Sequence, residues 1–137
     1  MWKRPLDGLT LLVVDHNPNA LTALDATLTA FGAVVLTARS GDEGLEQLAR
    51  ERVDVIISDI STPTFSSFEF LTAVRPVTGA TQRRIPAIAL VAVDGPAQRR
   101  RVLQGGFQAY FRKSVDLDEL VQEIVRLAEG RGRVRAA

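Results

Sequence analysis

Short apolar runs alternate along the chain with segments in which apolar side chains recur every three or four residues. The run LTLLVV at residues 9–14 includes β-branched residues and no charged position, which is typical of a strand buried on both faces of a sheet. Comparable runs predict four further strands, at residues 33–37, 53–60, 86–92 and 109–112. Each run is short enough to be one strand of a small domain.

Segments with helical periodicity fill the intervals between these strands. Ser40 precedes the second segment as an N-cap, with Glu43 three residues later in the capping-box pattern. Leu117, Leu120 and Val121 begin the clearest amphipathic period, near the end of the chain. We expect helices over residues 20–31, 41–52, 67–75, 96–103 and 117–127. Five strands alternating with five helices predict a doubly wound α/β fold with a parallel sheet covered on both faces.

Composition is consistent with one globular domain and excludes several kinds of site. The chain has 137 residues, of which 46% are hydrophobic and 24% charged, enough to bury a core. It contains no cysteine and a single histidine, His16. A disulfide framework, a cysteine nucleophile and a zinc site built from histidine and cysteine are therefore excluded.

Charge and hydropathy indicate no membrane or nucleic-acid partner. The formal net charge of +1 gives no strong field toward anionic surfaces. No apolar run approaches the roughly 20 residues of a bilayer-spanning helix, and MWKRPLDG at the amino terminus leads into no signal-peptide core. Three arginines at residues 99–101 are interpreted as a solvated helix face, since no helix-turn-helix pattern accompanies them. We expect a cytoplasmic protein without direct nucleic-acid contact.

Charged residues stand where three of the predicted strands end. Asp15 and His16 follow the first strand, Asp59 ends the third, and Lys113 follows the fifth. Ligands of such folds bind beyond the carboxyl ends of the strands, so these side chains are expected to converge. Two carboxylates can hold a hard cation and leave the lysine to meet an anion. The loop DHNPNA contains no glycine, which removes the main support for nucleotide binding.

Each of these residues also has a purely structural interpretation. An aspartate after a strand, such as Asp15, is commonly a turn or capping residue, and a single lysine such as Lys113 is commonly solvated. Asp59 is harder to explain in this way, because a buried carboxylate at the mouth of a central strand is costly without a partner. Their joint placement on three strand ends favours a metal-assisted phosphoryl site.

Four phrases of the sequence resemble the receiver domain of two-component response regulators. These are LLVVD, DVIISDI followed by Pro63, IPAIAL, and GFQAYFRKS. The resemblance covers residues 8–129, which we expect to form the receiver domain. Residues 130–137, GRGRVRAA, lose the apolar period and are expected to be a basic tail or the start of a linker.

The resemblance implies a role for each residue of the predicted site. Asp59 takes the place of the aspartate that accepts a phosphoryl group, and Lys113 that of the lysine that contacts the phosphate. Asp15 and Asp59 would hold Mg²⁺ together with the backbone carbonyl of Ser61. Tyr110 takes the place of the aromatic residue that changes rotamer on activation. The domain would thus be a signal acceptor rather than an enzyme.

The chain also departs from the family pattern at several positions. His16 replaces a second acidic residue, and imidazole nitrogen is a poor Mg²⁺ ligand, so weak Mg²⁺ binding is expected. Val91 replaces a hydroxyl residue, Ser114 replaces a proline, and Ser66 and Ser67 replace an Asp-Gly pair. His16 is open to three interpretations: a pH-sensitive partner, a ligand for a softer metal, or a polar residue that faces water, which we favour.

Three functions are consistent with these residues. The first is a phosphorylatable receiver that takes its phosphoryl group from a sensor histidine kinase or phosphotransfer protein. It would signal through the face of the fourth helix, fifth strand and fifth helix, to a downstream protein or a fused output domain, and homodimerise through that face. The second is a pseudo-receiver that binds proteins without phosphorylation. The third is a small phosphatase with Asp59 as nucleophile, which lacks an evident general acid or base.

Overall fold

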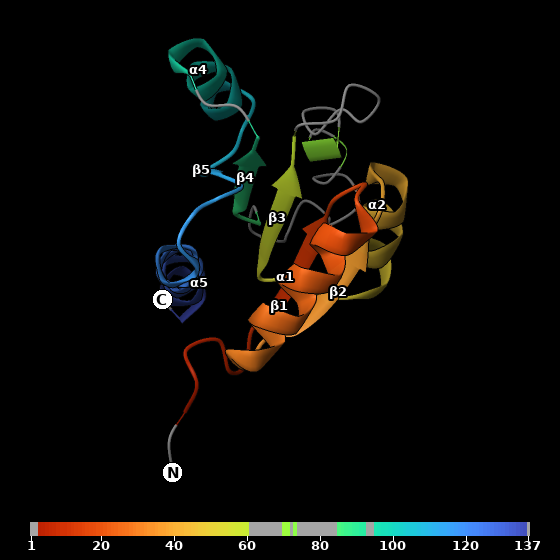
Figure 1. The fold of residues 1–137 in the computed structure, drawn as a ribbon. Helices are drawn as coiled ribbons and strands as arrows, with labels where there is room; N and C mark the ends of the chain where they lie inside the picture. The colour runs from red at the N-terminus through yellow and green to blue at the C-terminus, as the bar shows by residue number, and fades with distance from the viewer. Residues whose placement is uncertain (1–2, 61–69, 72, 74–84, 93–94, 137) are drawn as a thin grey trace.

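A parallel sheet of five strands forms the centre of the molecule (Figure 1). The structure, a computed structural model, describes residues 3–60, 70, 71, 73, 85–92 and 95–136. The strands are β1 (Thr10–Val14), β2 (Val34–Ala38), β3 (Val55–Asp59), β4 (Ala87–Val91) and β5 (Ala109–Arg112). Their order across the sheet is β2-β1-β3-β4-β5, and every neighbouring pair is parallel. The predicted doubly wound sheet is confirmed.

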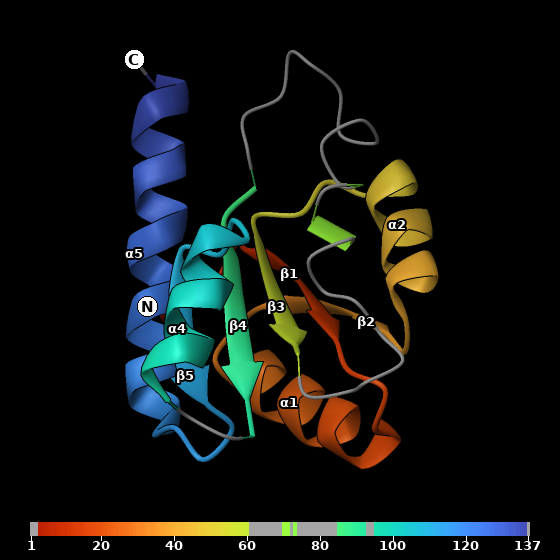
Figure 2. The ribbon, with the colours of Figure 1, turned by 90° about the horizontal axis from the view of Figure 1, so that it is seen from above.

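Helices cover both faces of this sheet (Figure 2). They are α1 (Pro18–Ala30), α2 (Gly41–Arg50), α4 (Pro96–Gln104) and α5 (Leu117–Ala136). Most of the third predicted helix, with Ser66 and Ser67, lies outside the described residues, although Phe70, Leu71 and Ala73 are helical. Within the part of the chain that the structure describes, no helix is both long and apolar enough to cross a membrane.

The two faces of the sheet bury two separate cores. Leu11 and Val13 point to the face covered by α1 and α5, and Leu12 and Val14 to the face covered by α2 and α4. This alternation follows from the period of two along a strand. Because both sets are buried, the strand reads as a continuous apolar run, as parallel strands generally do.

Side-chain caps fix where the first two helices begin. The Asn17 side chain accepts hydrogen bonds from the backbone N–H groups of Asn19 and Ala20, and Pro18 occupies the first turn. Helix α1 therefore begins two residues before the predicted start at residue 20. At α2 the predicted cap is present, since Ser40 Oγ accepts from the Glu43 N–H.

The last helix continues further than the sequence suggested. Residues 130–136, expected as a basic tail or the start of a linker, extend the backbone of α5 to Ala136. Arginine and alanine are good helix formers, so a helix already nucleated by a strong amphipathic period can propagate through this segment even though Gly130 and Gly132 disfavour it. The loss of the apolar period at residue 130 therefore does not mark the end of the helix.

Candidate functional site

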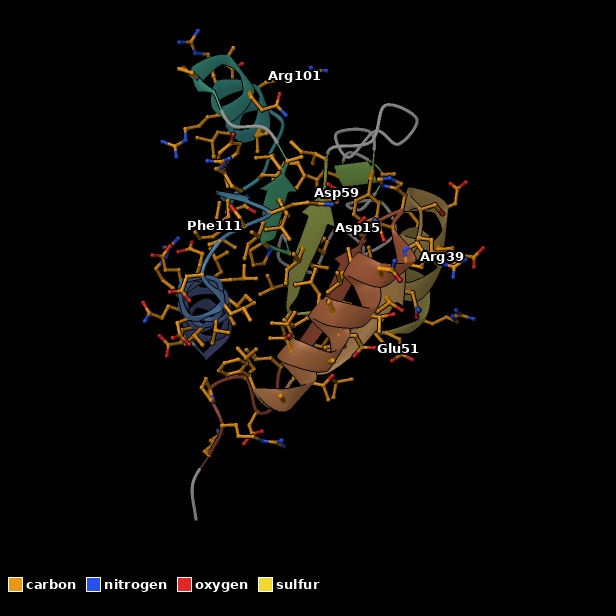
Figure 3. The ribbon with its side chains drawn as sticks, viewed as in Figure 1. Asp15, Arg39, Glu51, Asp59, Arg101 and Phe111 are labelled. Atoms are coloured by element: carbon orange, nitrogen blue, oxygen red, sulfur yellow. The ribbon has the colours of Figure 1, made fainter. Side chains whose placement is uncertain are left out.

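Two buried carboxylates lie side by side at the carboxyl ends of neighbouring strands (Figure 3). Asp15 follows β1, and its backbone N–H donates to the carbonyl of Ala38 at the end of β2 at 3.0 Å. Asp59 is the last residue of the central strand β3, in register with Leu90. Both residues are about 2% exposed, so the sheet itself fixes their position.

Lys113 joins the two carboxylates from β5. Its Nζ lies 3.1 Å from Asp15 Oδ2 and 3.3 Å from Asp59 Oδ1, and its side chain is 32% exposed. The Lys113 backbone N–H donates to the carbonyl of Val91 at 2.7 Å, which sets the lysine one position beyond the end of β5. The convergence predicted from the strand ends is therefore present for all three charges.

The charge of Lys113 is stabilised by this arrangement. Partial burial lowers the pKa of the ammonium group, but the hydrogen bond to Asp15 and the attraction of both carboxylates outweigh that effect. The net result is a pKa raised above its usual value of 10.5. Lys113 is thus a fixed positive charge at the mouth of the pocket.

His16 is also directed toward the carboxylates. Its side chain is 53% exposed, yet Nδ1 lies 3.3 Å from Asp59 Oδ2 and 3.7 Å from Asp15 Oδ1. The side chain therefore faces water on one side, as expected, and the two buried carboxylates on the other. Asp15 Oδ1 is also held by the backbone N–H of Asn17 at 2.9 Å, so the start of α1 helps to orient the carboxylate.

The donor set of the pocket suits a divalent cation. Asp15, His16 and Asp59 each offer one ligand atom, and these atoms lie within 4.8 Å of one another. The two carboxylate oxygens fit Mg²⁺, which prefers oxygen ligands, whereas the imidazole nitrogen fits it poorly. Ser61 and Pro63 lie outside the described residues.

The two expected switch positions lie on the neighbouring strands β4 and β5. Val91 ends β4, is 1% exposed and offers no hydroxyl group. Tyr110 is partly buried on β5, and the Arg99 guanidinium of α4 lies 5.3 Å from the centre of its ring. This cation–π contact was missed, because Arg99 was interpreted as part of a solvated face and no sequence spacing links α4 to a particular residue of β5.

Ser114 follows Lys113 in an exposed turn. Within the part of the chain that the structure describes, no peptide bond is cis, so the bond before Ser114 is trans. The turn accordingly needs no proline at this position.

Comparison with known proteins agrees with this geometry. The family model of the response regulator receiver domain matches residues 11–125. The chain is 36% identical over 118 residues to an uncharacterized 14.6 kDa protein of Leptolyngbya boryana, covering 85% of this chain and 88% of that protein. It is 36% identical over 114 residues to the transcriptional regulatory protein GlrR of Escherichia coli, covering 83% of this chain but 25% of that regulator.

Solved structures show the same fold. The chemotaxis response regulator CheY4 of Vibrio cholerae superposes with a TM-score of 0.75 at 28% identity, over 87% of this chain and 98% of that one. A receiver domain protein from Methanospirillum hungatei superposes with a TM-score of 0.78 at 21% identity, over 91% of this chain and 97% of that one.

Proposed function

The chain belongs to the response regulator receiver family of two-component signalling, and from this membership we propose that Asp59 accepts a phosphoryl group. The observation that carries the proposal is the position of Asp59, buried at the end of the central strand between Asp15 and Lys113. A carboxylate nucleophile fixed by the sheet beside an ammonium group is the arrangement that phosphoryl transfer requires. Partners of this function would be a sensor histidine kinase or a phosphotransfer protein, in the cytoplasm.

In the proposed transfer, a carboxylate oxygen of Asp59 attacks the phosphorus of a phosphohistidine donor. The new O–P bond gives an acyl phosphate, while the P–N bond breaks and its electron pair leaves with the donor imidazole, which takes up a proton. Lys113 lies within reach of both carboxylates and would neutralise charge on the phosphoryl oxygens. The protein receives the group and does not turn over a substrate, so we do not regard it as an enzyme.

A divalent cation belongs to the same proposal. Asp15 and Asp59 would hold Mg²⁺, with the backbone carbonyl of Ser61 as a further ligand expected from the family pattern. When bound, the ion would neutralise developing charge on the transferring group. We propose that Mg²⁺ binds weakly, because His16 offers nitrogen where the family offers a carboxylate.

Phosphorylation would change the surface formed by α4, β5 and α5, and this surface would bind the next protein in the signalling sequence. Val91 and Tyr110 are the switch positions on the path from Asp59 to this face. The recipient would be a downstream protein, a second copy of the chain, or an output domain fused after the receiver. We place the receiver at residues 8–129 and a basic tail or linker at residues 130–137; the family match to residues 11–125 supports the first of these two assignments.

Intact-mass spectrometry tests the proposal directly. After incubation with acetyl phosphate and Mg²⁺, the protein should gain one phosphoryl group that hydroxylamine removes, and Asp59→Asn should gain none. Asp54→Asn is the matched control, since this aspartate precedes the same strand but binds the Thr10 backbone N–H. Absence of labelling, also with Mn²⁺ or a beryllofluoride mimic, would instead support a module that binds proteins independently of phosphorylation.

A further inference from the structure

The two oxygens of each pocket carboxylate face different partners. Asp15 Oδ2 and Asp59 Oδ1 face the ammonium group of Lys113, at 3.1 and 3.3 Å. The other oxygens, Asp15 Oδ1 and Asp59 Oδ2, face Nδ1 of His16, at 3.7 and 3.3 Å. The pocket therefore has a cationic side and a separate side with two carboxylate oxygens and one imidazole nitrogen.

We propose that His16 is a metal ligand that shifts the preference of this pocket from Mg²⁺ toward borderline divalent ions such as Ni²⁺ and Zn²⁺. The ion would lie between His16 Nδ1 and one oxygen each of Asp15 and Asp59. The inference deepens the proposed function and rests on it in one respect: the pocket that accepts the phosphoryl group would work with a different ion.

Donor chemistry favours this preference. Imidazole suits Zn²⁺ and Ni²⁺, whereas Mg²⁺ demands oxygen ligands and keeps most of its water. Replacing an expected carboxylate by His16 also removes one negative charge, which weakens binding of a hard ion held mainly by charge. Both effects lower the affinity for Mg²⁺, and the nitrogen compensates only for ions that accept it.

The separations from His16 Nδ1 to the two carboxylates are close to those of a formed site, and all three donor atoms lie within 4.8 Å of one another. Two donors that bind one ion at about 2.1 Å lie about 3.0 Å apart at a right angle and about 3.4 Å apart in a tetrahedron. The two observed separations from His16 Nδ1, 3.3 and 3.7 Å, need only a small movement of the imidazole. That movement is available because the His16 side chain is half exposed, while the sheet holds both carboxylates.

The composition of the chain makes this site easy to observe. His16 is the only histidine, and there is no cysteine, so no other imidazole and no thiolate competes for Ni²⁺ or Zn²⁺. The proton signals of the imidazole in an NMR spectrum also belong to one known residue. Zn²⁺ should shift these signals at a stoichiometric ratio, and the same amount of Mg²⁺ should leave them in place.

Calorimetric titration of the tag-free, unphosphorylated chain provides the quantitative test. His16→Ala should weaken Ni²⁺ binding about tenfold or more, and change Mg²⁺ binding less than about twofold. His16→Asp should strengthen Mg²⁺ relative to Ni²⁺ by about tenfold or more, because it supplies the oxygen donor and the charge that Mg²⁺ prefers. Gln122→Ala, at an exposed position of α5, is the control and should change neither affinity.

Two results would overturn the inference. His16→Ala could leave Ni²⁺ binding unchanged, in which case the imidazole is not a ligand, or weaken both ions equally, in which case its role is structural. The binding test uses no phosphoryl donor, so its outcome is separate from that of the proposed function. If Asp59 is not phosphorylated but Ni²⁺ binding depends on His16, only the proposed phosphorylation is rejected. If Asp59 is phosphorylated but Ni²⁺ binding does not depend on His16, only this inference is rejected.

Discussion

Among single residues, the two buried carboxylates of the pocket depend on a nearby positive charge for their stability. Asp15 and Asp59 are buried next to each other, and two carboxylates in such a position repel each other and lose hydration. Lys113, directly after β5 and 98 residues further along the chain than Asp15, offsets this cost by bridging both carboxylates. A bound dication would offset the same cost, so Lys113 and the metal ion would both neutralise the charge of the two carboxylates.

Because Lys113 and a bound ion would neutralise the same carboxylates, the stability of Lys113→Met should depend on Mg²⁺. In metal-free buffer the variant should lose about 1–3 kcal/mol of unfolding free energy, because two buried carboxylates lose their counter-charge. Excess Mg²⁺ should reduce that deficit, since the ion stabilises the folded state that it binds, and without the competing ammonium group it should bind the variant more tightly than the wild type. Urea unfolding with and without Mg²⁺ measures both effects, and Lys3→Met at an exposed position should show neither. An equal deficit with and without Mg²⁺ would contradict the prediction.

At the scale of elements, the strands were predicted more accurately than the start of α1. Apolar runs identify buried parallel strands within one or two residues at each end, and β5 was predicted at its observed bounds, Ala109–Arg112. The beginning of α1 was missed, although Asn17 and Pro18 are a readable N-cap and first-turn pair. Both residues are polar or helix-breaking in most other contexts, so on sequence alone they resemble a continuation of the loop after β1.

The cap of α1 should contribute measurably to stability. Asn17→Ala removes an acceptor shared by two backbone N–H groups, so we expect a loss of about 0.5–2 kcal/mol. Asn19→Ala, an exposed position inside the same helix, should be neutral or slightly stabilising, because alanine has the higher helix propensity. Urea denaturation of the two variants separates the cap from a general effect of losing an asparagine. Equal losses would show that the cap contributes nothing.

At the scale of the whole molecule, topology explains which parts of the site could be predicted. The convergence of Asp15, Asp59 and Lys113 was predictable, because parallel strands place their carboxyl ends at one edge of the sheet. The direction of His16 and the contact of Arg99 with Tyr110 were not predicted, since both depend on rotamers chosen by packing. Sequence periodicity predicts the helix or strand to which a residue belongs. Packing then determines which neighbours its side chain contacts.

The path from the pocket to the α4–β5 surface crosses three neighbouring strands, and Val91 lies in its middle. In the receiver family that the chain belongs to, a hydroxyl residue is usual at this position, and we expect it to hydrogen-bond to the phosphoryl oxygens and so couple Asp59 to Tyr110. Val91 has nearly the shape of a threonine but has no hydroxyl group to form that bond. In addition, the Arg99 guanidinium lies over the Tyr110 ring and favours its present rotamer. Phosphorylation of Asp59 should therefore be transmitted poorly to Tyr110.

Fluorine NMR can measure this transmission, because Tyr110 is the only tyrosine and fluorotyrosine would label it alone. Beryllofluoride should shift the Tyr110 signal little in the wild type and clearly more in Val91→Thr, which supplies the missing hydroxyl at nearly equal volume. Val91→Ala is the matched control, since it alters packing without adding a donor and should behave like the wild type. A wild-type shift as large as that of Val91→Thr would mean that the signal reaches Tyr110 by steric contact along the sheet, without a hydroxyl at β4.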